Sequence, residues 1–118
     1  MLYTRLARIA AMMGIGLIIT LSLSPGSARP PTGLPGGIEH FIAYAPTAFA
    51  FGCGWPSRIQ RAAIVIGLFA LSGVLEALQL WVPGRHADVL TAVISGVGGL
   101  VGTLLATVAT AWAANRRR

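Results

Sequence analysis

The chain carries three acidic side chains, Glu39, Glu76 and Asp88, and each lies within or beside a long apolar segment. A soluble protein of this length would carry several times more charge on its surface. A carboxylate in the hydrocarbon of a bilayer costs up to ~3 kcal/mol unless it is paired or protonated, and acids found there often mark functional sites. These three carboxyl groups are therefore the first candidates for chemistry.

Helical spacing adds further polar groups to these acids. His40 and Tyr44 are four residues apart, so they share one helix face, and Gln79 follows Glu76 at three residues in the same way. Arg85 is the nearest cation to Glu76 along the chain, and its guanidinium fork suits a carboxylate. The predicted polar site comprises Glu39, His40, Tyr44, Glu76, Gln79, Arg85 and Asp88.

Each member of this site also has a structural interpretation. Glu76 and Arg85 can form a lock between helices, and Asp88 can cap the helix that follows it. His40 and His86 can be plain interfacial residues. The spacing of histidines and acids matches no strong metal-ligand motif, so we predict no metal and no cofactor. No nucleophile elbow accompanies the serines, so catalytic residues stay unassigned and enzymatic activity is uncertain, with its absence favoured.

Four apolar blocks must position these side chains. Hydrophobic residues make up 55% of the chain, charged residues 10%, and the mean hydropathy is +0.75. Each block approaches or exceeds the ~17 to 25 residues that cross ~30 Å of hydrocarbon as a helix. Alternating barrel strands of about 9 to 11 residues do not fit these blocks. We predict an all-α polytopic membrane protein, a single domain over 1–118 with four transmembrane helices at about 6–23, 38–54, 62–82 and 89–113.

The basic residues predict the orientation of this bundle. All nine are arginines, and they lie in the gaps and at the ends of the blocks. With a cytoplasmic N-terminus, seven face the cytoplasm and two, Arg29 and Arg85, face outward. This positive-inside bias predicts that both termini are cytoplasmic and that the polar site faces the outer side. The arginines do not form the single basic face of a nucleic-acid-binding protein, so we predict no nucleic-acid partner.

Two segments allow more specific predictions. Arg5 and Arg8 with a cleavage site at 26–28 would make the first block a secretory signal peptide, which is the main alternative to a transmembrane helix. The length of the block and the closeness of the next one favour the transmembrane helix. In the last block, Gly98 and Gly102 form a pattern that lets two helices approach closely, so we predict helix packing there.

Several short motifs occur in a fixed order between about residues 17 and 105. They are Leu21-Ser22-Leu23-Ser24-Pro25, Ile38-Glu39-His40-Phe41-Ile42-Ala43-Tyr44, Gly73-x-x-Glu76-x-x-Gln79, Pro83-Gly84-Arg85, Asp88, and finally Gly98 and Gly102. Their order and spacing resemble the VanZ-like family of small bacterial membrane proteins. Members commonly carry a second aspartate and an asparagine in the first turns of the fourth helix, where this chain has Thr91 and Ser95.

The resemblance implies a multi-pass protein of the bacterial inner membrane with a role in the cell envelope. The family's named member is associated with low-level resistance to the glycopeptide teicoplanin. We therefore expect an outward-facing site for the headgroup of a membrane lipid, with a lipid-linked envelope precursor as a further candidate partner. The alternatives are an intramembrane acid/base enzyme, a small lipid carrier and a structural partner subunit. The oligomeric state stays open.

Overall fold

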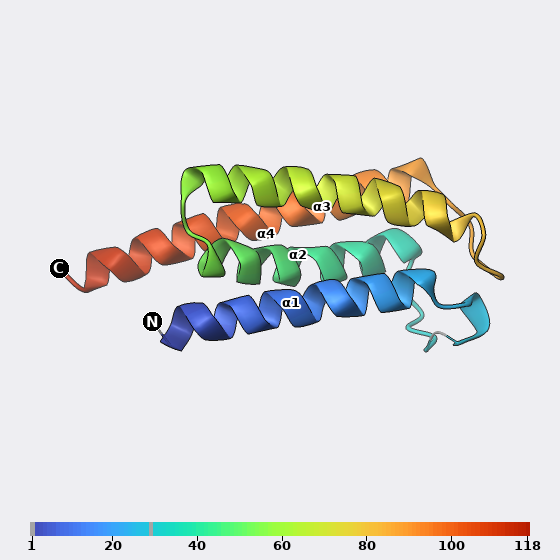
Figure 1. Cartoon of the computed structure of the whole chain (residues 1–118), viewed down its shortest axis with the longest axis horizontal. Coiled ribbons are helices and arrows are strands. Elements are labelled where there is room, and N and C mark those ends of the chain that lie inside the picture. The colour runs from blue at the N-terminus through green and yellow to red at the C-terminus, as the bar shows by residue number, and fades with distance from the viewer. Residues whose placement is uncertain (1, 29) are drawn as a thin grey trace.

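The computed structural model describes residues 2–28 and 30–118, and Figure 1 shows it as a ribbon. The described residues form helices and no strand, so the all-α prediction is confirmed. A short 3₁₀ helix, Gly26–Ala28, lies in the first loop. The four long helices are α1 (Leu2–Leu23), α2 (Gly36–Gly54), α3 (Arg58–Gln79) and α4 (Val89–Arg116).

The ends of α3 differ most from the prediction. The helix begins at Arg58, not at residue 62, because Ser57 and Gln60 form a capping box. The Ser57 hydroxyl accepts the Gln60 amide at 3.1 Å, and the Gln60 side chain accepts the Ser57 amide at 3.3 Å. The helix ends at Gln79 and not at residue 82, because the amides of 80–82 bond to carbonyls three residues back and tighten the chain into turns.

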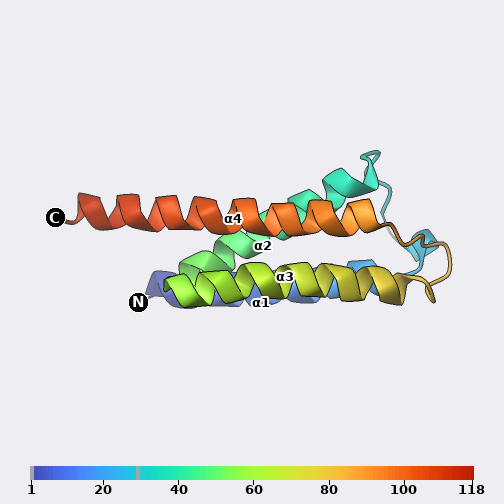
Figure 2. The same ribbon diagram turned by 90° about the horizontal axis from the view of Figure 1, so that it is seen from above.

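The helices form an elongated bundle of 53 × 22 × 21 Å. Helix α2 lies between α1 and α4, and α3 lies against α4 (Figure 1). Turned by 90°, the bundle shows α2 crossing obliquely from the layer of α1 and α3 toward α4 (Figure 2). A small core of buried residues joins α1, α2 and α3: Ile18, Tyr44, Ala48, Leu68 and Leu75.

Among the described residues, three helices, α1, α3 and α4, are long and apolar enough to cross a membrane. Their outward faces carry large apolar side chains, such as Met13, Ile66 and Val108, each more than two-thirds exposed. Apolar surface of this extent marks contact with a membrane or another protein. Helix α2 is not one of the three, because Glu39, His40 and several glycines lower its hydropathy.

Arginines from α1 and α3 close the C-terminal end of α2. The last carbonyls of a helix lack hydrogen-bond donors within that helix. A cation beside them is also favourable, because the C-terminal end of the helix dipole is negative. Arg8 donates from Nε to the carbonyl of Gly54 at 2.9 Å, and its guanidinium lies 5.0 Å from the ring centre of Trp55. Arg61 donates to the carbonyl of Gly52 at 3.0 and 3.2 Å. Arg8 therefore joins α1 to α2, and Arg61 joins α3 to α2.

Candidate functional site

Four helix ends meet at one end of the bundle. The C-terminal ends of α1 and α3 and the N-terminal ends of α2 and α4 lie there, opposite the two chain termini (Figure 1). The two loops between these helices, 24–35 and 80–88, lie at the same end. Up-and-down topology thus brings the predicted polar residues of three separate segments to one level of the bundle. We call this the polar end.

The C-terminal end of α1 is capped by side chains from α3 and the loop after it. The carbonyl of Leu21 would normally accept from residue 25, but Pro25 has no amide hydrogen. Arg85 donates to this carbonyl at 2.9 Å and to that of Ser22 at 3.1 Å. Gln79 donates from Nε2 to the same Ser22 carbonyl at 2.9 Å and is only 3% exposed. The carbonyls at the end of α1 that lack a helical donor thus fix the positions of two predicted site residues, Gln79 and Arg85.

A backbone contact between the two loops places Arg85. The Gly26 amide donates to the carbonyl of Pro83 at 3.1 Å, so it is not available to α1. A Cβ atom on Gly26 would collide with the carbonyl oxygen of Gly84. Gly84 itself has φ +73°, a conformation that favours glycine. The Pro-Gly-Arg sequence therefore turns tightly against the first loop and directs Arg85 back over the end of α1.

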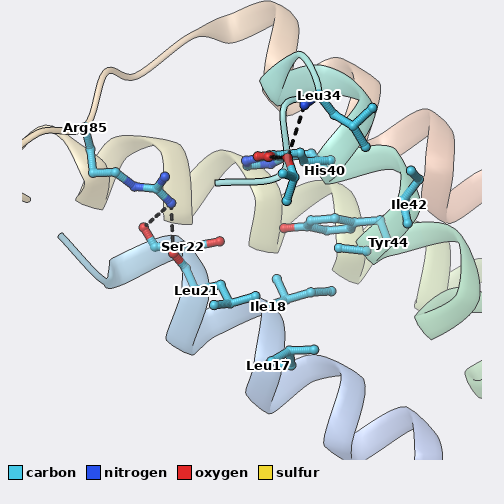
Figure 3. Close-up of a pocket in the computed structure, with 12 residues that line it drawn as sticks. Leu17, Ile18, Leu21, Ser22, Leu34, His40, Ile42, Tyr44 and Arg85 are labelled. Atoms are coloured by element: carbon cyan, nitrogen blue, oxygen red, sulfur yellow. Dashed lines mark hydrogen bonds between the residues drawn. The ribbon is translucent and has the colours of Figure 1, made fainter. Parts of the chain in front are cut away.

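A cavity of about 210 Å³ lies between α1, α2 and the two loops. Figure 3 shows its lining, with Leu17, Ile18 and Leu21 of α1 along one side and Ile42 and Tyr44 of α2 opposite. Polar side chains from four segments complete the lining: Ser22, Thr32, Glu39, His40 and Arg85. The cavity is therefore apolar along its helical walls and polar where it reaches the loops.

His40 has a defined orientation. The Ser95 hydroxyl, which is fully buried on α4, donates its one hydrogen to the Thr91 carbonyl at 2.8 Å. The same hydroxyl lies 3.1 Å from His40 Nδ1, within hydrogen-bond distance. The imidazole also stacks on the Tyr44 ring, with an angle of 9° between the planes. These contacts hold the ring while it lines the cavity.

Glu39 is held by the first loop. The Thr32 hydroxyl donates to Glu39 Oε1, and the Leu34 amide donates to the Thr32 hydroxyl at 3.2 Å. Glu39 lies in the first turn of α2, where the positive end of the helix dipole favours a carboxylate. The first loop and the first turn of α2 therefore fix the position of this carboxyl group beside the cavity.

Glu76 and Asp88 organise the start of α4. Asp88 is the N-cap, and its carboxylate accepts the Leu90 amide at 3.0 Å, as the capping interpretation predicts. Glu76, only 7% exposed, accepts the Asp88 amide at 2.8 Å through Oε2. The hydroxyl of Ser72, one turn earlier on α3, lies within hydrogen-bond distance of two carbonyls, that of Phe69 at 2.8 Å and that of Ala92 on α4 at 3.1 Å. One face of α3 thus holds the first turns of α4.

The predicted site divides into two groups. Glu39, His40, Tyr44 and Arg85 line the cavity, whereas Glu76, Gln79 and Asp88 hold helix ends outside its lining. The suggested pairing of Glu76 with Arg85 is replaced by separate backbone partners, Asp88 for the acid and α1 carbonyls for the arginine. Among residues 2–28 and 30–118, no group of three or more histidines, cysteines and acids could hold a metal ion.

Two polar lining residues, Ser22 and Thr32, were missed from the sequence. Pro25 leaves the carbonyl of Leu21 without its helical donor and so marks this end of α1 for a distant donor, but nothing along the chain marks Ser22 itself. Thr32 gave no comparable signal, because its role depends on how the first loop folds over Glu39. Comparison of the chain with protein-family models, curated proteins and solved structures found no match.

Proposed function

We propose that the chain is an integral protein of the bacterial inner membrane that crosses it four times and binds the phosphate-bearing headgroup of a lipid at its outer end. The observation that carries this proposal is the cavity between α1 and α2. Its walls are apolar, and its polar lining includes a cation, Arg85, and an oriented imidazole, His40. An amphiphile has the same division between an apolar chain and a polar head.

Packing supports a fourth crossing by α2. The helix lies between α1 and α4 and runs beside α1 for most of the length of α1, so a membrane crossed by its neighbours would enclose it as well. Its polar residues Tyr44 and Thr47 are buried within the bundle, at 2% and 6% exposure. Glu39 and His40 lie at its N-terminal end, where headgroups and water replace hydrocarbon. Helix α2 can therefore cross the membrane although its mean hydropathy is low, because its polar residues are buried or lie at its end.

The cavity opens sideways toward the surrounding lipid. Leu17 and Ile42 lie on its two helical walls and are 59% and 54% exposed. Its 210 Å³ is below the ~300 to 1,000 Å³ of sites that enclose a whole drug-sized ligand. We infer that it takes the headgroup and the first methylenes of one chain, while the rest of the lipid stays in the bilayer.

The arginine distribution and the motif resemblance support the cellular setting. Seven arginines at the end opposite the cavity favour a cytoplasmic location for both termini. The cavity then faces the outer leaflet, where lipid-linked envelope precursors are also exposed. The resemblance to VanZ-like proteins favours a role in the cell envelope, with altered glycopeptide sensitivity as its phenotype.

Filling the cavity tests the proposal. Ile42→Trp adds a large ring to the wall of α2, so we expect the purified protein to lose at least about three-quarters of the phospholipid that co-purifies with it in mild detergent, as measured by native mass spectrometry. Leu104→Trp is the control, because Leu104 is equally exposed on α4 but lies outside the cavity lining. In a deletion strain grown with teicoplanin and other envelope stresses, only the control should complement. Equal lipid retention by both variants would overturn the proposal.

A further inference from the structure

We infer that the C-terminal half of α4 binds an anionic phospholipid, with the phosphate at Arg116 and one acyl chain along the same face of the helix. This surface lies at the end of the bundle opposite the polar end, so it is separate from the cavity. We call this opposite end the basic end, because seven arginines lie there. Only the crossing of the membrane by α4 is required, and the ligand of the cavity plays no part.

Helix α4 is long enough to reach the headgroups on both sides of a bilayer. Its 28 residues rise about 42 Å at 1.5 Å per residue, which matches the ~40 to 45 Å of a bilayer with its headgroup layers. The helix begins at the polar end, and its last turns extend beyond α2 and α3 in both views (Figure 1, Figure 2). When its first turn lies at one membrane surface, Arg116 therefore lies among the headgroups of the other.

One face of α4 presents side chains in the order in which a phospholipid presents its own parts. Four residues that follow one another at three or four positions share this face, which we call the lipid face: Leu105, Val108, Trp112 and Arg116. The first three are 56%, 68% and 57% exposed, so the other helices leave this face uncovered. An acyl chain can therefore lie along Leu105 and Val108, while the Trp112 ring lies at the level of the glycerol and Arg116 at that of the phosphate.

Trp112 holds Arg116 in a position that suits a phosphate. The Arg116 guanidinium lies over the Trp112 ring, 3.9 Å from its centre, so the two groups form a cation–π contact. Such a contact uses the face of the guanidinium, whereas its N–H groups lie in its plane and form a fork that fits two phosphate oxygens. Because the ring already restricts this side chain, binding a phosphate costs less conformational freedom than it would for an unsupported arginine.

The charges around the lipid face favour a headgroup with a net negative charge. Arg117 and Arg118 follow Arg116 directly, and all three acidic side chains of the chain lie at the polar end. A phosphatidylcholine or phosphatidylethanolamine headgroup would bring its own cation among these arginines, and like charges repel. Phosphatidylglycerol and cardiolipin offer the same phosphodiester without a cation. Basic residues next to a membrane surface attract anionic lipids of this kind.

Quenching of Trp112 fluorescence tests this surface directly. The chain has three tryptophans, so Trp55→Phe combined with Trp81→Phe leaves Trp112 as the single reporter. The protein is reconstituted into vesicles with equal amounts of phosphatidylglycerol and phosphatidylcholine of identical chains, and one lipid at a time carries bromine on its acyl chains. We expect the quenching to show about three- to fivefold more phosphatidylglycerol than phosphatidylcholine beside Trp112, which is the effect of one arginine at an anionic surface.

Two matched controls locate the effect. Arg116→Gln should bring the lipid ratio at Trp112 to about one, whereas Arg58→Gln should keep most of the enrichment, because it removes the same charge from an exposed position at the same end but outside the lipid face. A protein that keeps only Trp81, which is 78% exposed at the polar end, should report a ratio near one. Native mass spectrometry of the two glutamine variants with all three tryptophans present, after exchange with the same two lipids, repeats the comparison without substitution of Trp55.

Three results would overturn this inference. Equal quenching of Trp112 by the two lipids is the first, and it is also the result expected if these arginines bind an acidic protein or a nucleic acid instead of a lipid. Equal losses in Arg116→Gln and Arg58→Gln are the second, because the attraction would then belong to the net charge of the basic end. An equal enrichment at Trp81 is the third. None of these results bears on Ile42→Trp, which tests the cavity.

Discussion

Side chains at the polar end mostly bind backbone groups that secondary structure leaves unsatisfied. Arg85 and Gln79 donate to the last carbonyls of α1, and Glu76 accepts an amide at the start of α4. A backbone group that is buried in apolar surroundings without a hydrogen-bond partner lowers the stability of a protein by about 1 to 3 kcal/mol. These polar side chains therefore stabilise the bundle by pairing such groups, although burying any of them alone would be costly. The scarcity of charge in the chain therefore does not mean that every charge acts on a ligand.

The Arg85 cap predicts a specific loss of stability. Arg85→Ala leaves the carbonyls of Leu21 and Ser22 with fewer donors, so we expect the free energy of unfolding to fall by about 1.5 to 3 kcal/mol. Unfolding in mixed micelles with increasing SDS, followed by circular dichroism, measures it. Arg58→Ala is the control, since it removes the same charge from an exposed position at the other end. A loss of the same size in both variants would contradict a capping role.

At the scale of the helices, the close contact between α2 and α4 depends on glycines of α4, which have no side chain to hold the two backbones apart. A Cβ atom on Gly102 would overlap the carbonyl oxygen of Ala45, and one on Gly98 would lie 3.1 Å from that of Phe41. The two glycines that the sequence assigns to helix packing therefore face α2, and the backbones approach closely there. This close approach also supports the Ser95–His40 hydrogen bond, which joins the same two helices.

Substitution of Gly102 should separate these helices. Gly102→Ala forces the backbone of α2 away from α4, and overpacking of this kind costs about 1 to 3 kcal/mol. Gly16→Ala provides a matched comparison, because a Cβ atom at Gly16 meets nothing within 4 Å and alanine favours the helix by about 1 kcal/mol. Thermal unfolding in detergent should show a lower midpoint for the first variant and an equal or higher one for the second. An equally stable Gly102→Ala protein would refute this packing.

At the scale of the whole molecule, the placement of α2 decides the topology. If α2 crosses the membrane with its neighbours, the loop before it and the loop after it face opposite sides. Cys53 is the only cysteine and is buried, so Cys53→Ser gives a background in which single cysteines can be introduced. Ser27, Pro56 and Asn115 are exposed positions in the loop before α2, in the loop between α2 and α3, and in the last turn of α4.

Labelling of these cysteines measures the number of crossings. We expect a membrane-impermeant maleimide added to spheroplasts to label Ser27→Cys, and to label Pro56→Cys and Asn115→Cys only after the membrane is opened. Labelling of Pro56→Cys in intact spheroplasts would contradict a crossing by α2. The intact mass of the protein in the same samples tests the alternative of a cleaved signal peptide, because cleavage at 26–28 would remove all of α1.

Composition and periodicity alone determined the helical class, the approximate positions of all four helices and the level at which polar residues gather. These properties follow from local rules, because an apolar run of given length favours one helix and alternating helices return to the same end. The Asp88 cap was also predictable, since an N-cap depends on two or three neighbouring residues.

Tertiary structure alone decided which polar residues share a cavity and which hold helix ends. Glu76 and Arg85 look like partners along the chain, but the rotation of α3 directs the acid to the start of α4, and the Gly84 turn directs the arginine to α1. His40 finds Ser95, which lies 55 residues away. Rotation of a helix about its axis and the path of a loop depend on packing against other segments, and spacing along one segment carries no information about either.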